Sequence, residues 1–226
     1  MIQRKMNSSR FLLCFCTVAF YADKVWSSKI SDEKALLREK MTAILRNMTE
    51  EERKAESDLA ILKLLHLPTF HGCERVGVYL NTELEVQTEK LIRHILGKGH
   101  RCFVPRINDT TMDMVLLRSM DDYNALPVNE FGFKEPDRND WSRENGLVKG
   151  GMDVIIIPGL AFTLRGDRLG RGRGIYDRYI TSIRPRHNPA LIGLAFTRQI
   201  LKEIPRADYD IKVDTVMTAK YGQRRH

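Results

Sequence analysis

Two features of the sequence predict an α/β fold. Short apolar runs, several of them β-branched, occur near residues 76, 102, 154, 191 and 213, as is typical of buried strands. Segments with apolar residues at helical spacing lie between most of these runs. Strands that alternate with helices indicate a mainly parallel or mixed sheet flanked by helices. We therefore expect a three-layer, Rossmann-like domain.

Length and charge limit the class of protein. A chain of 226 residues forms one domain or at most two. The formal net charge is +8, but the excess of Lys and Arg is concentrated in residues 1–30 and 216–226, so the rest is nearly neutral. A folded body without a basic excess does not favour nucleic acid as a partner. The four cysteines show no zinc-ligand spacing, which favours a reducing compartment.

Residues 1–30 differ from the rest and are predicted to be a targeting-like or disordered extension. A basic start is followed by an apolar run at 11–20 that is too short to span a bilayer. The pattern is compatible with a secretory signal, with an organellar presequence, or with an extension that has no role. We expect no stable membrane insertion, a folded domain over residues 31–218, and a basic tail over residues 219–226.

The first half of the folded domain is predicted to hold two helices followed by a strand–helix unit. Ser31 is expected to cap a helix that runs to Met48. Thr49 begins a capping box, and the helix after it is expected to bury Ala55, Leu59, Leu62 and Leu65. A strand at 76–80, a helix around 91–96, and two paired strands at 101–107 and 112–117 follow.

The second half begins with a polar, turn-rich region at 121–150. Long loops in compact domains tend to be functional or mobile. A buried strand at 154–157, a helix from Ile175, a strand at 190–196 and a short helix from Thr197 are expected next. The alternating segment 210–214 is expected to run into a last strand.

Between the strand at 154–157 and the helix from Ile175 lies a segment rich in glycine and arginine, residues 165–174, here called the Gly-Arg loop. Glycines let backbone N–H groups approach an anion, a helix N-terminus adds partial positive charge, and guanidinium groups bind phosphate in bidentate fashion. The spacing matches neither the Walker pattern nor the dinucleotide fingerprint, which would need glycine at Ile175. The loop predicts an anion site, against a solvated basic loop or an RGG-like RNA-binding tract.

Asp177 lies about one turn into the helix after the Gly-Arg loop. A carboxylate that faces a bound phosphate is repelled unless a cation lies between them, so Asp177 suggests Mg²⁺. The competing interpretation is an acidic residue that stabilises the helix dipole.

Two linked motifs carry a resemblance to a known family. The segment Pro158-Gly159-Leu160-Ala161-Phe162, followed by Gly166-x-Arg168-Leu169-Gly170-x-Gly172-x-Gly174-x-Tyr176-Asp177, resembles the signature of 5-formyltetrahydrofolate cyclo-ligase (methenyltetrahydrofolate synthetase). The resemblance covers residues 34–218. Ile175 replaces an aromatic residue that is usual in this family, and Thr163 stands where the family often has Asp.

The resemblance implies a set of site residues. Nucleotide contacts are implied for Lys34, Arg38, Arg168, Leu169, Gly170, Arg171, Gly172, Arg173, Gly174, Ile175 and Tyr176. Substrate contacts are implied for Arg38, Leu80, Glu85, Phe131, Arg171, Gly172, Arg173, Gly174 and Ile175. Asp177 and Asp210 would hold the metal, and Arg171 and Arg173 would be catalytic.

Several of these residues have simpler interpretations. Lys34 and Arg38 are four residues apart and also fit a solvated helix face. Glu85 fits an exposed carboxylate in the first turn of a helix. Asp210, with Asp214, fits an edge strand whose acidic residues discourage aggregation.

The resemblance implies that ATP and Mg²⁺ drive the conversion of 5-formyltetrahydrofolate to 5,10-methenyltetrahydrofolate, with release of ADP and phosphate. The enzyme would be a monomer that acts on small molecules in the cytoplasm or the mitochondrion. One alternative is a non-catalytic nucleotide- or RNA-binding protein that uses the Gly-Arg loop. Another is a sugar-phosphate isomerase with Glu85 as its base, which would not need ATP.

Overall fold

The computed structural model describes residues 9–130 and 132–224, with side chains described for 28–130 and 132–222. The helices are α1 (Ser9–Arg46), α2 (Glu50–Leu65), α3 (Pro68–His71), α4 (Glu89–Gly97), α5 (Met120–Ala125) and α6 (Ile175–Ile183), with 3₁₀ turns at Val148–Gly150 and Thr197–Gln199. The strands are β1 (Arg75–Gly77), β2 (Arg101–Asn108), β3 (Thr111–Leu117), β4 (Val154–Ile157), β5 (Ala161–Phe162), β6 (Arg168–Leu169), β7 (Ala190–Leu194), β8 (Thr215–Met217) and β9 (Gly222–Arg224).

The described strands form one mixed sheet and a small hairpin. The order in the seven-stranded sheet is β3-β2-β1-β4-β7-β8-β9, and β5 pairs with β6 in the hairpin. The five central strands, β2, β1, β4, β7 and β8, are parallel to one another, whereas β3 and β9 are antiparallel edge strands. The predicted α/β class with a mainly parallel or mixed sheet is confirmed.

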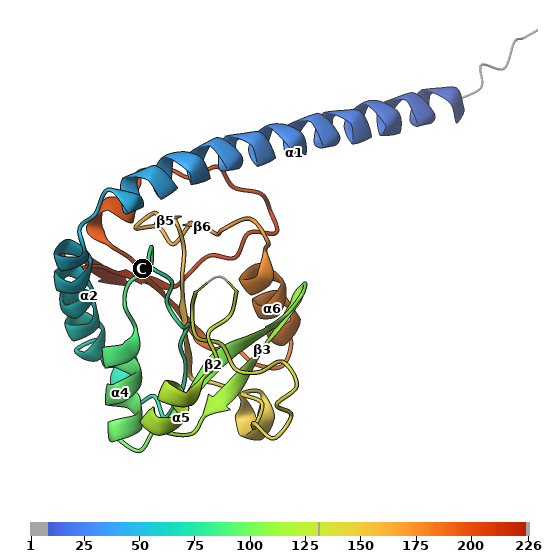
Figure 1. Ribbon diagram of the computed structural model, residues 1–226. Coiled ribbons are helices and arrows are strands. Elements are labelled where there is room, and N and C mark those ends of the chain that lie inside the picture. The colour runs from blue at the N-terminus through green and yellow to red at the C-terminus, as the bar shows by residue number, and fades with distance from the viewer. Residues whose placement is uncertain (1–8, 131, 225–226) are drawn as a thin grey trace, which may run out of the picture.

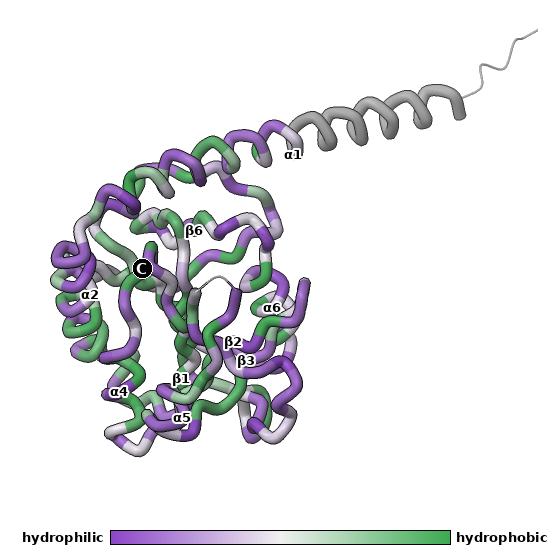
Figure 2. The backbone as a smooth tube through the Cα atoms, in the orientation of Figure 1, coloured by the Kyte–Doolittle hydropathy of each residue, from purple (hydrophilic) through white to green (hydrophobic). Residues whose placement is uncertain are grey.

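Helices cover both faces of the sheet (Figure 1). On one face, Met41 of α1, Ile61 of α2 and Ile92 of α4 pack with buried sheet residues such as Val76. On the other face, Ile180 of α6 packs in a second cluster with residues of β2, β4, β7 and β8. Hydrophobic residues are concentrated in the central strands and on the inward sides of these helices (Figure 2). The expected three layers are therefore present.

Two details of the helical prediction were wrong. Ser31 lies inside α1 and does not cap it, because residues 9–46 contain neither Gly nor Pro and the helix continues across that position. In α2, Leu59 and Leu62 are exposed, and the buried stripe is Ser57, Ala60, Ile61 and Leu64. Both stripes have helical spacing, and packing against α4 and β8 selects the second.

Two predicted strands differ in extent. The strand expected at 76–80 ends at Gly77 in β1, although the Val78 N–H still donates to the Phe103 carbonyl at 2.8 Å. The alternating segment 210–214 is not a strand, because β8 begins at Thr215. Since β8 lies between β7 and β9, the edge-strand interpretation of Asp210 and Asp214 was also wrong.

The capping box at the start of α2 is confirmed. The Thr49 hydroxyl accepts from the Glu52 N–H at 3.1 Å, and the Glu52 carboxylate accepts from the Thr49 N–H at 3.0 Å. We expect Thr49→Ala to lower the free energy of unfolding by about 1 kcal/mol, because two helix-end donors lose their partners. Urea unfolding measures this, with Thr181→Ala on the exposed side of α6 as the control. Equal stability of the two variants would contradict the expected role of the cap.

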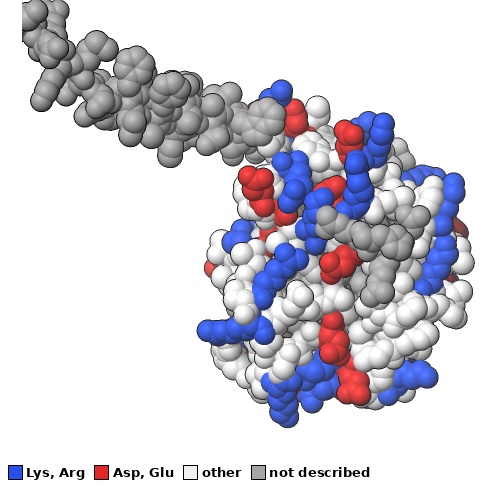
Figure 3. Space-filling view, turned by 180° about the vertical axis from the view of Figure 1, so that it is seen from behind, with Lys and Arg blue, Asp and Glu red and all other residues white. Residues whose placement is uncertain are grey.

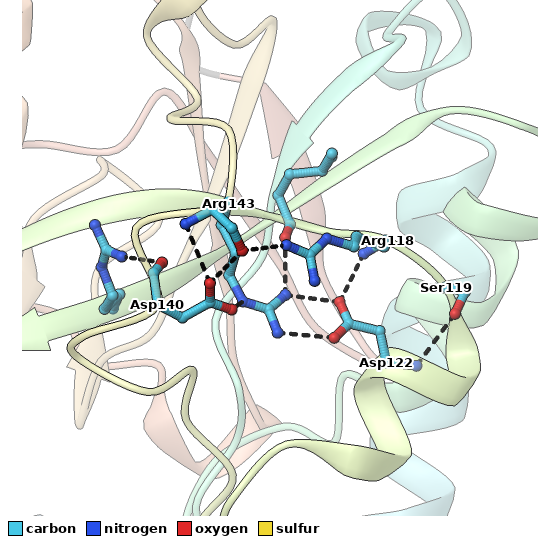
Figure 4. Close-up of polar contacts among 8 residues, drawn as sticks. Arg118, Ser119, Asp122, Asp140 and Arg143 are labelled. Atoms are coloured by element: carbon cyan, nitrogen blue, oxygen red, sulfur yellow. Dashed lines mark hydrogen bonds and ion pairs between the residues drawn. The ribbon is translucent and has the colours of Figure 1, made fainter.

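The segment at 121–150, which was predicted to be a long loop, begins within helix α5 and is held by an ionic cluster (Figure 4). The Arg143 guanidinium lies between two carboxylates, 2.6 Å from Asp122 and 2.9 Å from Asp140. The hydrogen bond from Arg143 holds the pKa of Asp122 below its usual range, against the opposing effect of burial. This cluster ties the end of the loop to α5. Within the described part of the chain, none of the helices combines the length and the apolar run that crossing a bilayer requires.

Candidate active site

The described residues of the predicted site gather at the carboxyl edge of the parallel strands, where ligands bind in open α/β sheets. The Gly-Arg loop follows β4 through the β5–β6 hairpin and leads into α6. The sequence predicted that Arg168 and Leu169 lie in an open loop. In the structure they form strand β6. In Figure 1, the hairpin lies beneath the later part of α1, which carries Lys34 and Arg38.

A tight turn at residues 163–167 fixes the start of the Gly-Arg loop. The Thr163 hydroxyl is 2.8 Å from the Asp167 carboxylate and accepts from the Asp167 N–H at 3.1 Å. Lys212 forms an ion pair of 2.8 Å with the same carboxylate. Gly166 has φ +87°, and a Cβ at this position would lie 2.2 Å from the Val213 carbonyl oxygen. Thr163 therefore acts as a turn residue here.

We expect Gly166→Ala to destabilise the protein by about 1–3 kcal/mol, because alanine strains the positive φ and collides with backbone. Chemical denaturation is the measurement. Gly72→Ala is the matched control, since a Cβ at Gly72 meets no heavy atom within 4 Å. A loss at Gly166 no larger than at Gly72 would contradict the strain argument.

Arg168 and Asp177 form a mostly buried ion pair. Arg168 Nη2 lies 2.6 Å from Asp177 Oδ2, with side-chain exposures of 5% and 18%. Arg168 also donates to the Pro158 carbonyl at 3.2 Å, and the Ile211 N–H donates to the other oxygen of Asp177 at 3.1 Å. Burial opposes ionisation of Asp177, but the charge of Arg168 and these hydrogen bonds keep its pKa below the usual range. Arg168 thus joins β6 to the first turn of α6.

Lys34 and Arg38 both face the site from α1. Lys34 is buried, and its ammonium lies 2.5 Å from the carboxylate of Asp210. Asp210 also accepts from the Ala207 N–H at 2.6 Å. Arg38 Nε donates to the Gly170 carbonyl at 2.9 Å, which fixes α1 against the Gly-Arg loop. The solvated-face interpretation of these two residues was therefore wrong.

Arg171 contacts the turn that follows β1. Its Nε lies 3.0 Å from Glu85 Oε1, and its Nη2 donates to the Thr82 hydroxyl at 2.7 Å. The second oxygen of Glu85 accepts from the Thr82 N–H at 2.9 Å. Glu85 is buried, so its interpretation as an exposed first-turn carboxylate was wrong. Burial, and then the Glu85 carboxylate, raise the pKa of Tyr176, which keeps the phenol neutral.

The start of α6 offers backbone donors to an anion. Gly172 and Gly174 have φ +110° and +59°, conformations that glycine adopts without strain. The N-cap residue of α6 is Gly174, which has no side chain to accept from the first N–H groups of the helix, and these groups follow directly after the Gly-Arg loop. Arg173 donates to the Asp109 carbonyl in the β2–β3 turn. The predicted anion site therefore has the helix N-terminus and guanidinium groups that it requires.

The segment around position 131 is held at the end of β2, although Phe131 itself lies outside the described residues. Glu135 accepts from the Ile107 N–H at 2.8 Å and from the Asn129 amide at 2.9 Å. Lys134 donates to the carbonyls of Tyr123 and Asn124 at 2.9 Å and 2.8 Å. The Glu135 bonds position this turn at the carboxyl end of β2, and the Lys134 bonds tie it to α5. Leu80, which follows β1, is buried.

Thr82 is a polar contact that sequence reasoning missed. It occurs in a short Asn-Thr-Glu turn, and nothing in its local pattern indicates that an arginine 89 residues away would donate to it. A hollow of about 540 Å³ lined by Arg93, His100, Arg101 and Arg118 lies elsewhere, near the start of β2. It is therefore separate from the site at the carboxyl edge.

The two predicted metal ligands lie on neighbouring segments. Asp177 accepts from the N–H of Ile211, the residue after Asp210. Among the described residues, no group of three or more His, Cys, Asp or Glu side chains is arranged to hold a metal. Mg²⁺ usually takes one or two carboxylates and completes its octahedron with phosphates and water. Two carboxylates beside the candidate anion site fit this coordination pattern, although each is paired with a cation in this structure.

On the face seen in Figure 3, the charged side chains are not all of one sign. Lys and Arg side chains are interspersed with Asp and Glu beneath α1. A continuous basic surface is the usual feature of a protein that binds nucleic acid through phosphate contacts. The cations in the site act instead in individual pairs with carboxylates.

Fold and site together define an α/β protein with a candidate anion site at the carboxyl edge of its sheet. The model of the 5-formyltetrahydrofolate cyclo-ligase family matches residues 30–219. The chain therefore belongs to this family.

Individual relatives agree with this membership. A 5-formyltetrahydrofolate cyclo-ligase of Mus musculus is 35% identical over 192 residues, which cover 83% of this chain and 94% of the relative. The mitochondrial cyclo-ligase of Arabidopsis thaliana is 28% identical over 207 residues, covering 84% and 75%. The solved structure of a 5,10-methenyltetrahydrofolate synthetase from Aquifex aeolicus superposes with a TM-score of 0.71 at 32% identity, covering 85% of this chain and 92% of that one.

Proposed function

We propose that this protein is an ATP- and Mg²⁺-dependent 5-formyltetrahydrofolate cyclo-ligase that produces 5,10-methenyltetrahydrofolate, ADP and phosphate. The observation that carries the proposal is the convergence of Arg168, Arg171 and Lys34 with the start of α6 at one sheet edge, in a chain of this family. Such a site suits phosphoryl transfer, which depends on positioning and charge neutralisation rather than on a protein nucleophile.

ATP binding is assigned to Lys34, Arg38 and the residues from Arg168 to Tyr176. Arg38 already contacts Gly170, so α1 and the Gly-Arg loop would enclose the triphosphate from two sides. The N–H groups at the start of α6 would bind phosphate oxygens, aided by the helix dipole. Tyr176 packs against the core as a neutral phenol, which positions this turn of the helix.

The folate substrate is assigned to the side of the site formed by Leu80, Glu85 and the turn around 131. A carboxylate accepts two hydrogen bonds in parallel, which suits the donor-rich edge of a pterin. Glu85 is buried and its second oxygen is fixed by the Thr82 N–H, so its orientation is set before a ligand arrives. Arg38 and the loop residues 171–175 would contact both substrates.

Asp177 and Asp210 are assigned to Mg²⁺. The ion, when bound with ATP, would neutralise phosphate charge and make the γ-phosphorus easier to attack. The carboxylates of Asp177 and Asp210 would leave their present partners, and Arg168 and Lys34 would turn to phosphate oxygens. Each internal ion pair would then be exchanged for a pair with the incoming ligand.

The reaction needs an activated formyl oxygen, because that oxygen is a poor leaving group. The γ-phosphoryl group moves to the formyl oxygen: a P–O bond to ADP breaks and a P–O bond to the formyl oxygen forms. N10 then attacks the formyl carbon and loses its proton, and phosphate departs with the electrons of the C–O bond as the ring closes. Arg171 and Arg173 would stabilise the charge on the transferring group.

The test is the appearance of methenyl product when the purified protein is mixed with 5-formyltetrahydrofolate, Mg²⁺ and ATP. We expect product only in the complete mixture, with none when ATP is omitted or Mg²⁺ is chelated. A folded protein that binds ATP and yields no product would support the non-catalytic nucleotide-binding alternative. Product formation on a sugar phosphate without ATP would support an isomerase.

Location and assembly remain predictions. A monomer over residues 31–218 with an extension over residues 1–30 is expected in the cytoplasm or the mitochondrion. Fusion of residues 1–30 to a fluorescent protein tests the mitochondrial alternative. Size-exclusion chromatography with light scattering tests the monomer.

A further inference from the structure

Arg171, Glu85 and Thr82 form a closed set of contacts that joins the two halves of the site. Arg171 binds Glu85 through Nε at 3.0 Å and Thr82 through Nη2 at 2.7 Å. The Thr82 N–H holds the other oxygen of Glu85 at 2.9 Å. We call these three residues the clasp. In it, the guanidinium assigned to the transferring phosphoryl group is bound by the carboxylate assigned to the pterin.

The clasp makes Arg171 differ from the other arginine of the loop. Arg173 binds only a carbonyl among the contacts found for it, whereas Arg171 is bound to a buried carboxylate. A charge-assisted contact with a buried partner is stronger than an exposed contact with a neutral one. The Glu85 side chain is 8% exposed and that of Arg171 is 44% exposed, so Arg171 is the partner that can move.

We propose that Thr82 is a positioning residue: with Glu85 it holds Arg171 on the pterin side of the site until the folate substrate engages Glu85, and the release of Arg171 then strengthens nucleotide binding. This inference rests on the proposed function. The donors of the pterin compete with Arg171 for Oε1 of Glu85, which frees the guanidinium to turn toward phosphate. Folate and nucleotide therefore favour each other's binding, and the coupling is reciprocal.

The clasp would also limit wasteful use of ATP. When folate is absent, only the small fraction of protein with an open clasp presents Arg171 to phosphate, so the contribution of Arg171 to nucleotide affinity is reduced. The free energy of a hydrogen bond to a charged group is large enough to change the fraction of protein with an open clasp by about fivefold or more. Loss of the Thr82 hydroxyl should therefore open the clasp to that extent without removing any group that touches ATP.

The experiment is calorimetric titration of the full chain with a non-hydrolysable ATP analogue and Mg²⁺, with and without 5-formyltetrahydrofolate. For the wild type we expect about fivefold or tighter nucleotide binding when folate is present. Thr82→Val keeps the shape and the backbone N–H but removes the hydroxyl. It should bind the analogue more tightly than wild type in the absence of folate, so the coupling shrinks. Thr82→Ser keeps the hydroxyl and should behave as wild type.

The outcomes separate this inference from the proposed function. If Thr82 had only a structural role, its replacement would weaken nucleotide binding. Unchanged or weaker nucleotide binding by Thr82→Val in the absence of folate would therefore contradict the proposed role of the clasp. Thr82→Ala provides the same test if the valine variant fails to fold. Wild-type protein that binds both ligands without coupling overturns the clasp alone. Wild-type protein that binds neither ligand overturns both.

Discussion

Replacing Arg168 with alanine is expected to lower the free energy of unfolding by about 3–5 kcal/mol, because it leaves the carboxylate of Asp177 mostly buried without its cation. The two groups are 2.6 Å apart, and only 5% and 18% of their side chains are exposed. Loss of Arg168 also removes a donor to the Pro158 carbonyl at the end of β4. Equilibrium unfolding in guanidinium chloride at pH 7 measures the change.

Two controls show whether the pair is responsible. Arg178→Ala removes a guanidinium from α6, the helix that carries Asp177, but Arg178 is exposed and its hydrogen bonds go to the Thr110 carbonyl. Its loss should be within about 0.5 kcal/mol. The double variant Arg168→Ala/Asp177→Ala should lose less than the sum of the two single variants, because neither partner is left alone. Additive losses would contradict the pairing.

The loss in Arg168→Ala should depend on pH. In the wild type, the pKa of Asp177 is below its usual range, so the stability from this pair is present above about pH 4 and is lost as pH falls through the native value. Without Arg168, burial becomes the dominant influence and raises that pKa above the unfolded value. The variant then loses stability as pH rises through about 4 and beyond, so its deficit against the wild type should be larger at pH 7 than at pH 5. A deficit that is independent of pH would contradict the assignment to an ionised Asp177.

The sequence could predict the Gly-Arg loop because the information is local. A buried strand, glycines at close spacing and a helix start occur within some thirty consecutive residues, and each has its own pattern. The partners of the cations could not be predicted in this way. Lys34 and Asp210 are 176 residues apart, and only the sheet order brings them to one edge. The resemblance implied that Lys34 contacts nucleotide and that Asp210 contacts metal, but it did not imply that the two side chains form an ion pair.

The wrong predictions for α2 and for segment 210–214 also arose because the deciding contacts are distant in sequence. α2 has apolar residues on two helical stripes, so spacing alone cannot decide whether Leu59 or Ile61 faces the core. Segment 210–214 alternates like a strand, yet Asp210 and Lys212 bind Lys34 and Asp167, which keeps the chain out of the ladder. Tertiary contacts decided each case.

Replacing Arg171 or Arg173 with alanine is expected to reduce turnover by about 10²-fold or more, because each removes a guanidinium aimed at the charge that develops on the transferring phosphoryl group. For Arg173→Ala the effect should fall on kcat rather than on the KM for ATP, since the remaining loop N–H groups and Lys34 still bind the ground state. Arg171→Ala should lower kcat and also raise the KM for ATP, because the released Arg171 contributes to nucleotide binding. Steady-state formation of methenyl product measures both constants.

Arg178→Ala is again the matched control, because Arg178 contacts the same β2–β3 turn as Arg173 but lies in α6 beyond the loop. We expect its turnover within about twofold of the wild type, as for other exposed substitutions. Arg171→Lys should restore less than half of the loss on a logarithmic scale, because an ammonium keeps the charge but not the planar fork that binds two oxygens. If Arg171→Ala and Arg173→Ala both kept wild-type turnover, neither residue would stabilise the transferring group.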